Sequence, residues 1–250
     1  MKMTNAMLLA CGLALACASA VSAQTPDEPP RAFVSLGGGF QFAGSSSTDS
    51  GSFDLYDEVG SFSGPRKIGN TPFFDAAAGM HITGKISGGV AFSRFAKGSD
   101  VSFTALVPHP LFAGELRTIA LGVNDLRHTE TAIHLQGIYQ LFTFSRYDIS
   151  VFGGPSVILV KEDRVAAINA TEGGTPFTAV KLDPKFASSS KTTLGGNVGL
   201  DANYRLTGEF GAGVFIRYTI ASVKMPAAGD ATRKVTVGGP QVGLAVRYRF

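Results

Sequence analysis

Residues 194–205 read Leu-Gly-Gly-Asn-Val-Gly-Leu-Asp-Ala-Asn-Tyr-Arg, and this alternation decides the fold class. One face of an extended chain would carry Leu194, Val198, Leu200, Ala202 and Tyr204, and the other Asn197, Asp201, Asn203 and Arg205. Successive side chains of a β-strand point to opposite faces, so a period of two with one apolar face predicts a half-buried strand.

The same alternation recurs seven more times along the chain. The other expected strands are 32–43, 73–82, 85–95, 131–142, 147–160, 209–223 and 241–250. We find no convincing helical period after residue 30, so the sequence predicts an all-β protein of eight strands. Pro155 and Pro240 fall inside strands, where each removes a ladder hydrogen bond, and we expect β-bulges there. In the expected strand 131–142, the apolar face carries Ile133, Leu135, Tyr139 and Leu141.

The connections between these strands alternate in length. Short turns are expected near 83–84, 145–146 and 207–208, and long connections at 44–70, 98–129, 163–190 and 224–233. Short turns at one end and long loops at the other are typical of outer-membrane barrels. The Ser-rich stretch 45–50 predicts a mobile, solvated loop. The apolar stretch 101–123 could either extend the strands above the membrane or present a binding patch.

Composition excludes several classes of protein. The 250 residues are 44% hydrophobic and 16% charged, which is too apolar for a disordered chain. A formal net charge of +3, without a cluster of Lys and Arg, argues against nucleic-acid binding.

The first 23 residues resemble a secretory signal peptide. Lys2 supplies the positive start, an apolar run follows, and 21–23 end in the small residues that signal peptidase recognises. We therefore expect a signal peptide at 1–23, a short periplasmic lead at 24–30 and a barrel domain at 31–250. Cys11 and Cys17 both lie in the signal, so disulfides and cysteine chemistry are not expected in the mature chain. Lipidation at Cys17 would need a better lipobox.

A soluble barrel of the lipocalin type would show the same period with its apolar face inward. Aromatic residues at the short-turn ends of the apolar faces favour a membrane barrel, because such rings are favourable at a membrane interface. The expected aromatic girdle is Tyr139, Tyr147, Tyr204, Phe210, Tyr248 and Phe250. Arg94 also falls on the expected lipid face, and we place it at the outer interface.

The chain resembles the small eight-stranded outer-membrane barrels of the OmpA/OmpX-like class. The resemblance rests on the signal, the strand count, the loop asymmetry, the glycine-proline stretches 153–157 and 238–242, and the final alternation to Tyr248 and Phe250. That ending is similar to the C-terminal signal recognised by the barrel assembly machinery. The resemblance implies a monomer in the bacterial outer membrane, in contact with its lipid. The chain departs from OmpA in ending at the barrel, so we expect no peptidoglycan-binding domain.

The polar faces predict a charged barrel interior. Its expected members are Asp75, His81, Lys85, Glu130, His134, Asp148, Asp201, Arg205, Glu209, Arg217, Arg247 and Arg249. Such a set could line an ion path, but in a narrow barrel we favour a paired network that packs the lumen. The histidines have no metal-like spacing. No Ser-His pair is found on the lipid face, so no catalytic residues and no cofactor are expected.

The sequence therefore predicts a non-enzymatic outer-membrane protein with a structural or surface-interaction role through its outer loops, which could contact a surface ligand of unknown identity. The alternative is a narrow channel for ions or small apolar solutes. A lipid-modifying enzyme is the least favoured function.

Overall fold

The computed structural model describes residues 31–42, 46–174, 177, 179–226 and 232–250, and the expected signal peptide and periplasmic lead lie outside them. The ten strands are β1 (Ala32–Gln41), β2 (Ser46–Leu55), β3 (Glu58–Lys67), β4 (Thr71–Thr83), β5 (Ile86–Pro108), β6 (Leu116–Phe144), β7 (Tyr147–Glu172), β8 (Val180–Arg205), β9 (Phe210–Pro226) and β10 (Thr232–Arg249). None of the described residues forms a helix long and apolar enough to cross a membrane.

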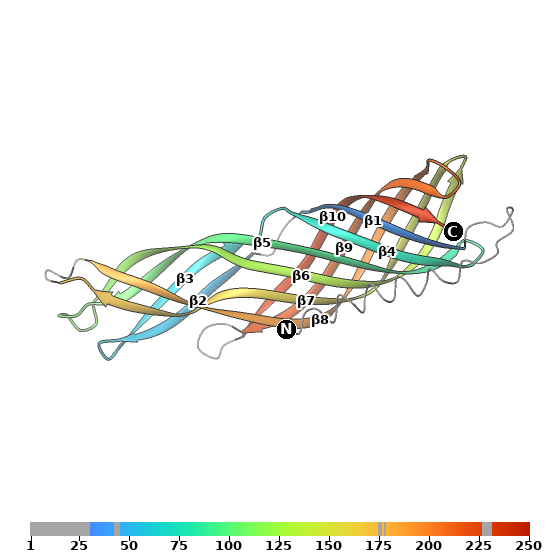
Figure 1. Ribbon diagram of the computed structural model, residues 1–250. Helices are drawn as coiled ribbons and strands as arrows, with labels where there is room; N and C mark the ends of the chain where they lie inside the picture. The colour runs from blue at the N-terminus through green and yellow to red at the C-terminus, as the bar shows by residue number, and fades with distance from the viewer. Residues whose placement is uncertain (1–30, 43–45, 175–176, 178, 227–231) are drawn as a thin grey trace, which may run out of the picture.

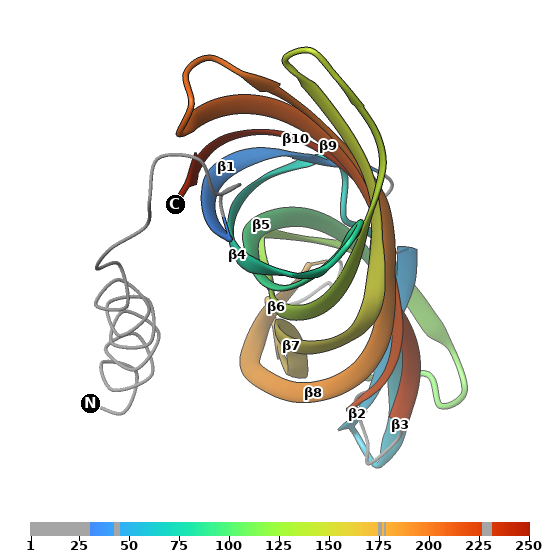
Figure 2. The same ribbon diagram turned by 90° about the vertical axis from the view of Figure 1, so that its right-hand side faces the viewer.

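Eight of the described strands close a ring. The hydrogen-bonded order is β5-β4-β1-β10-β9-β8-β7-β6, and β6 pairs again with β5. Every pairing is antiparallel, and Figure 2 shows the ring from near its end. The prediction of an eight-stranded antiparallel barrel is confirmed, and each ring strand overlaps one expected strand.

The long connections are not the irregular loops that the sequence indicated. Most of their described residues continue the strands, so that β5 to β8 run on as far as Pro108, Leu116, Glu172 and Val180. The first connection forms the hairpin β2–β3, which pairs with β5 at 61–63, so the expectation of a loop over 45–50 is wrong for its described residues, 46–50. The molecule is therefore elongated, with the ring at one end (Figure 1).

The far end forms a second folded unit, which we call the outer extension: β2, β3 and residues 99–126 and 163–187. Pairing of β6 with β7 stops at His128 and Glu162, whereas β5–β6 and β7–β8 continue. Two layers result, and an apolar core fills the space between them. It contains Phe62, Val101, Phe103, Ala105, Val107, Val123, Leu126, Val165 and Ile168. The apolar stretch 101–123 thus extends the strands, although Leu111 and Phe112 stay exposed.

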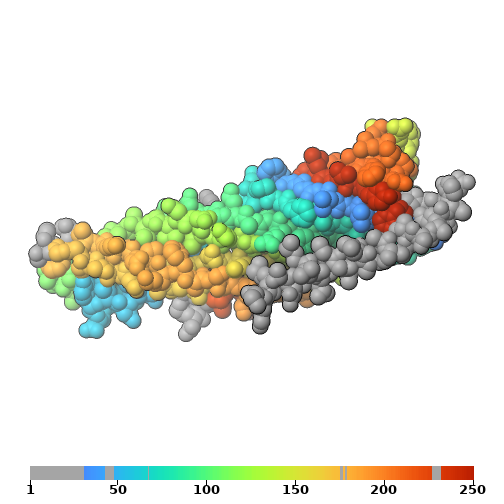
Figure 3. All heavy atoms as spheres, in the orientation of Figure 1, coloured from blue at the N-terminus to red at the C-terminus, as the bar shows by residue number. Residues whose placement is uncertain are grey.

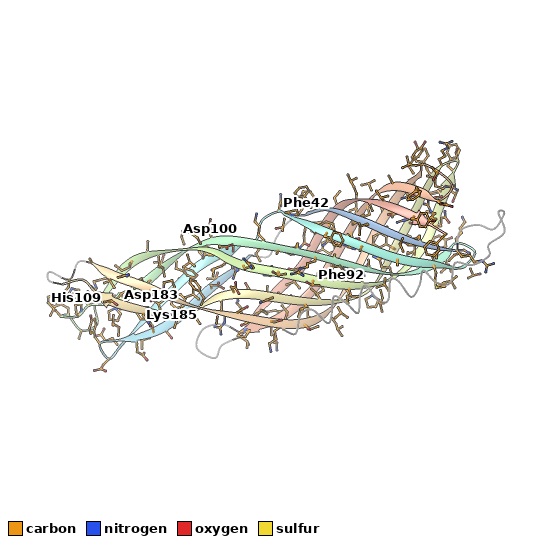
Figure 4. All side chains as sticks on the ribbon, viewed as in Figure 1. Phe42, Phe92, Asp100, His109, Asp183 and Lys185 are labelled. Atoms are coloured by element: carbon orange, nitrogen blue, oxygen red, sulfur yellow. The ribbon has the colours of Figure 1, made fainter. Side chains whose placement is uncertain are left out.

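The apolar face of the ring points outward. Leu36, Leu194 and Leu244 are 59%, 76% and 69% exposed, and the opposite faces of the same strands are buried or half-buried. An inward apolar face, as a soluble barrel requires, is excluded by this arrangement. Figure 4 marks two of the aromatic residues of this part, Phe42 and Phe92.

The bulges lie at positions other than those predicted. The pairing registers of β7 and β10 run through Pro155 and Pro240 without a shift, so both proline predictions are wrong. At Pro155 the ladder to β6 is instead interrupted between His134 and Gly137. A bulge between Gln140 and Phe142 changes the phase of β6, so that Phe142, at 66% exposure, takes the outward place expected for Leu141.

Candidate functional site

Besides two buried apolar clusters around Met225 and Phe215, the barrel interior contains paired polar side chains in three groups. The first lies at the short-turn end, where Arg249 Nη2 donates to Asp148 Oδ2 at 3.1 Å and to Asn203 Oδ1 at 2.6 Å. Beside it, Arg247 makes a two-pronged contact with Asp201 at 2.9 and 3.1 Å. Arg205 approaches Asp148 at 3.3 Å and is one-third exposed, so this rim is partly solvated.

The middle group centres on Arg217, which is 1% exposed. Its guanidinium donates to Asp75 Oδ2 and, through Nε, to Gln241 Oε1 at 2.7 Å. Gln241 in turn donates to Gln41 at 2.7 Å. The rings of Phe73 and Phe215 lie within 6 Å of the guanidinium carbon. Strands β1, β4, β9 and β10 are thus joined across the lumen, as a paired network requires.

His134 forms the third group, with two serines and an asparagine. Nε2 lies 3.1 Å from Ser93 Oγ, Nδ1 lies 2.8 Å from Ser156 Oγ, and Asn197 donates to Ser156 at 2.9 Å. The sequence did not predict this histidine-serine contact, because it lies in the lumen and not on the lipid face, where such a pair was expected in a lipid-modifying enzyme. Both ring nitrogens are bonded to hydroxyls, so no carboxylate orients the ring as in a catalytic triad.

A fourth cluster closes the outer mouth of the ring, and we call it the neck cluster: Arg66, Asp49, Glu162 and Arg233. Arg66, from the hairpin β2–β3, is 0% exposed and reaches Glu162 at 2.9 Å. It also donates to the carbonyls of Asp163 at 2.7 Å and Leu126 at 2.8 Å. Arg233 binds Asp49 at 2.6 Å and Glu162 at 2.8 Å. Burial raises the pKa of Asp49, although Arg233 and Arg66 oppose the shift.

Little space remains between these groups. One cavity of about 60 Å³ lies among the lower and middle side chains, including Asp75, Asp201 and Arg217. Another of about 10 Å³ lies beside His134 and Glu130, whose carboxylate contacts His128 at 2.9 Å. Pockets that bind small molecules usually measure about 300–1,000 Å³, so these cavities have room for a few water molecules only.

Three expected members of the interior network lie outside it. His81, Lys85 and Glu209 are exposed at the short turns, because the strands end there and the side chains pass the rim. The remaining expected members, including Glu130, lie inside the ring as described above. The sequence did not predict the neck cluster, because Arg66 and Asp49 lie in a connection without clean alternation. The only signal at these two positions is that each is a charged residue in a Gly/Ser-rich stretch.

The expected girdle residues gather at the short-turn end. Tyr147 and Tyr204 rings lie 5.0 Å apart, and Tyr248 lies 4.8 Å from Phe210 and 5.9 Å from Phe250. Tyr139 is 46% exposed on the same outward face. The terminal residue itself is held in the ring, because Phe250 and Ala32 exchange two backbone hydrogen bonds at 2.9 and 3.0 Å. Arg94 is exposed on the outer face of β5.

No group of three or more potential metal-binding side chains occurs among the residues that the structure describes. The lumen therefore offers ion pairs, hydroxyl-histidine contacts and small cavities. Its chemistry is that of a packed interior.

Comparison with known families decides the class. The model of the outer membrane protein beta-barrel domain matches residues 13–250, nearly the whole chain. The chain belongs to this family. This outer-membrane barrel accordingly has its short turns in the periplasm and its outer extension outside the cell. Its localisation is the bacterial outer membrane, as the sequence predicted.

Solved structures with a similar fold come from several bacteria. Neisserial surface protein A is 13% identical, with a TM-score of 0.44 over 88% of this chain and 97% of that one. OprG from Pseudomonas aeruginosa is 15% identical, with a TM-score of 0.46 over 89% and 97%. The outer membrane protease OmpT from Escherichia coli is 11% identical, with a TM-score of 0.44 over 92% and 99%. No curated protein matches the sequence.

Proposed function

We propose that this outer-membrane barrel is a non-enzymatic surface protein whose ring anchors a rigid outer extension for contacts outside the cell. The observation that carries the proposal is the outer extension itself, which has its own apolar core and continues strands of the ring. Folded β-structure of this kind holds its end in a defined position, unlike a flexible loop. Arg66 further ties the hairpin β2–β3 to the barrel mouth.

The end of the outer extension exposes apolar side chains. Val59, Leu111 and Phe112 are 64%, 64% and 57% exposed, and Leu116 is 49% exposed. The β2–β3 turn and the β5–β6 turn are joined there, since Gly114 N donates to Glu58 Oε1 at 2.9 Å. Figure 4 labels His109 at this far end. Apolar groups of this kind on a protein surface often mark interaction sites.

The filled lumen argues against the alternative of a channel. A permeating ion would have to displace the Arg217–Asp75 contact and then the neck cluster, both buried. In planar bilayers we expect the protein to show no stable conductance steps. Steps that change when Arg66→Ala opens the neck would favour the channel instead.

A retention assay tests the surface role directly. Cells that display the protein are compared with cells that display Leu111→Ser/Phe112→Ser, on supported phosphatidylcholine bilayers and on layers of cells producing the same protein. We expect at least tenfold better retention of the wild type on one of these surfaces. The matched control is Asp54→Asn/Glu115→Gln, which changes exposed polar side chains near the same end. Equal retention of wild type and the apolar variant on both surfaces would contradict the proposal.

A further inference from the structure

Each strand from β6 to β10 carries an exposed basic residue near the outer end of its ring portion, on the apolar face in every strand except β8. These are Arg127, Lys161, Lys191, Lys224 and Lys234. On every one of these strands, the basic residue lies 12 to 14 positions from the girdle aromatic of the same strand. The separation is 12 from Tyr139 to Arg127, 14 from Tyr147 to Lys161, 13 from Tyr204 to Lys191, 14 from Phe210 to Lys224 and 14 from Tyr248 to Lys234. The five cations therefore lie at one level.

That level is the outer boundary of the hydrocarbon. Thirteen residues of a strand tilted by about 45° rise about 30 Å, since a strand advances about 3.3 Å per residue. The hydrocarbon core of a bilayer is also about 30 Å thick. With the girdle at the periplasmic interface, the basic residues lie where the headgroups of the outer leaflet begin.

The two cations on β9 and β10 stand directly opposite each other. Lys224 and Lys234 are Cα partners in the antiparallel ladder. Like charges in this position destabilise a strand pair, because their Cβ atoms are only about 5 Å apart. Within the described residues, no carboxylate forms an ion pair with either lysine. Among the residues that the structure describes, this repulsion is uncompensated.

A third lysine lies beside this pair. Pairing of β8 with β9 ends at Gly195 and Ala221, but Thr193 Oγ1 still donates to Ser222 O at 2.7 Å. Lys191 and Lys224 each lie two residues further out from this contact. Lys191 is exposed there although its phase on β8 is that of the inward side. Three exposed ammonium groups thus follow one another across β8, β9 and β10.

The other two cations are less suited to an anion. Arg127 lies on β6 and Lys161 on β7, and each has an acidic residue two positions away on its own strand. These are Asp125 and Asp163. The charge on that side is partly balanced by acidic residues. Within the described part of the chain, the uncompensated positive charge is therefore concentrated on Lys191, Lys224 and Lys234, which we call the lysine triad.

We propose that the lysine triad is a binding site for the phosphate groups of the lipid that forms the outer leaflet. Phosphate is the anionic chemistry that this level of the membrane supplies, and an ammonium group binds it by charge-assisted hydrogen bonds. A phosphate between Lys224 and Lys234 changes a repulsive pair into a bridged one. The site would fix the depth and orientation of the barrel relative to the outer leaflet.

The first test measures lipid binding by the full folded chain in uncharged detergent. Native mass spectrometry and the thermal unfolding midpoint are followed as diphosphorylated lipid A is added, and again with lipid A from which both phosphates are removed. We expect binding of the phosphorylated form to be at least tenfold tighter, and to weaken with salt. Equal binding of the two forms would overturn the proposal.

The site is then located by a matched pair of variants. Lys191→Gln/Lys224→Gln/Lys234→Gln removes the triad and should weaken binding of the phosphorylated lipid at least tenfold. The control Lys85→Gln/Lys181→Gln/Lys185→Gln removes the same charge from exposed positions at a periplasmic turn and in the outer extension. It should bind as the wild type does. Equal losses in both variants would show that only net charge matters, and the proposal would fail.

A charge reversal gives a readout that does not depend on the triple variant folding. Lys234→Glu changes the repulsive pair with Lys224 into an attractive one, so its unfolding midpoint without lipid should rise above that of the wild type. The same variant should lose most of the rise that phosphorylated lipid A produces. A variant that is less stable without lipid and still responds fully would contradict the assignment.

A soluble competitor distinguishes the membrane lipid from a free anion. Inositol hexakisphosphate, a soluble polyphosphate, should compete only weakly with lipid A, because it lacks the acyl chains that place the phosphate at this level. Tight binding of inositol hexakisphosphate without binding of lipid A would overturn the lipid assignment.

Discussion

At the scale of single residues, the buried Arg217 has the largest predicted effect on stability. Its removal leaves Asp75 charged, 6% exposed and without its cation. Breaking a buried ion pair in this way costs roughly 3–5 kcal/mol. We therefore expect Arg217→Ala to lower the urea concentration at which half of the protein is unfolded. The measurement is the loss of the folded band in gels of unboiled samples.

Two further variants interpret that result. Arg217→Met/Asp75→Leu removes both charges and should recover most of the loss, since an apolar pair leaves no unpaired ion. Arg205→Ala, at the partly solvated rim, should cost about 1 kcal/mol or less. Equal effects of Arg217→Ala and Arg205→Ala would mean that water reaches the middle of the lumen.

A second prediction at this scale concerns the pKa of Glu172, in the outer extension. Arg117, on β6, donates to both carboxylate oxygens of Glu172, on β7, and to the carbonyls of Pro108 and Phe177. The hydrogen bonds from Arg117 lower the pKa of Glu172 below its ordinary value of 4.5. Because the folded-state pKa is the lower one, the stabilisation is complete above pH 4.5 and is lost as the pH falls through the lowered pKa.

The carboxyl carbon of Glu172 can be titrated by NMR in the folded protein. We expect a midpoint below 4.5 that moves upward in Arg117→Gln. A wild-type midpoint at or above 4.5 would show that Arg117 does not hold the two layers together at this point in solution.

At the scale of elements, the pairing of β1 with β10 closes the ring and depends on glycine. A Cβ atom at Gly39 would lie 2.0 Å from the carbonyl oxygen of Val242, and one at Gly37 would lie 2.2 Å from that of Leu244. Backbone atoms in a closed ladder cannot move aside easily. We therefore expect Gly39→Ala to destabilise the barrel by about 1–3 kcal/mol.

Gly196→Ala is the matched control for that substitution. It also lies in a ring strand, but the nearest atom to an added Cβ is Gly154 O at 3.9 Å, an ordinary contact. Its unfolding midpoint should stay close to that of the wild type. Similar losses in both variants would point to a general effect of replacing glycine in strands rather than to the closing pair.

At the scale of the whole molecule, the ring and the outer extension have separate cores. The extension is filled by Phe62, Phe103 and their neighbours. The lumen is filled by ion pairs and by two other apolar clusters, one of Phe73, Phe95 and Phe215 and one around Met225. The gold and cyan surfaces of β7, β8, β2 and β3 account for much of the far end in the space-filling view (Figure 3). The barrel should therefore fold without the extension.

A shortened chain tests this separation. Residues 46–67, 100–124 and 164–187 are replaced by short Asn-Gly turns. In gels of the outer-membrane fraction, both this chain and the wild type should migrate differently before and after boiling, because a closed barrel resists detergent until heated. Loss of the shift in the shortened chain alone would show that the extension is needed to close the ring.

The sequence by itself determined the ring. Period-two alternation, as in 194–205, fixes which faces are apolar, and the positions of short turns fix the strand order, because antiparallel neighbours in a barrel follow the chain. The paired interior also followed from it, since charges such as Asp75 and Arg217 recur on the inward phase of separate strands. These features depend on local patterns that each strand carries alone.

Only the tertiary structure decided what lies beyond the membrane and inside the neck. Arg66 and Asp49 become buried because the hairpin β2–β3 folds back over the barrel mouth. There Arg66 contacts Asp163, which lies 97 positions further along the chain, and no local period encodes such a contact. A bulge such as that at Gln140 and Phe142 moves every later side chain to the opposite face without a distinctive residue to announce it. Packing between strands likewise decides which segments the long connections pair with. The alternation within these connections could therefore not show by itself whether their residues form loops or strands.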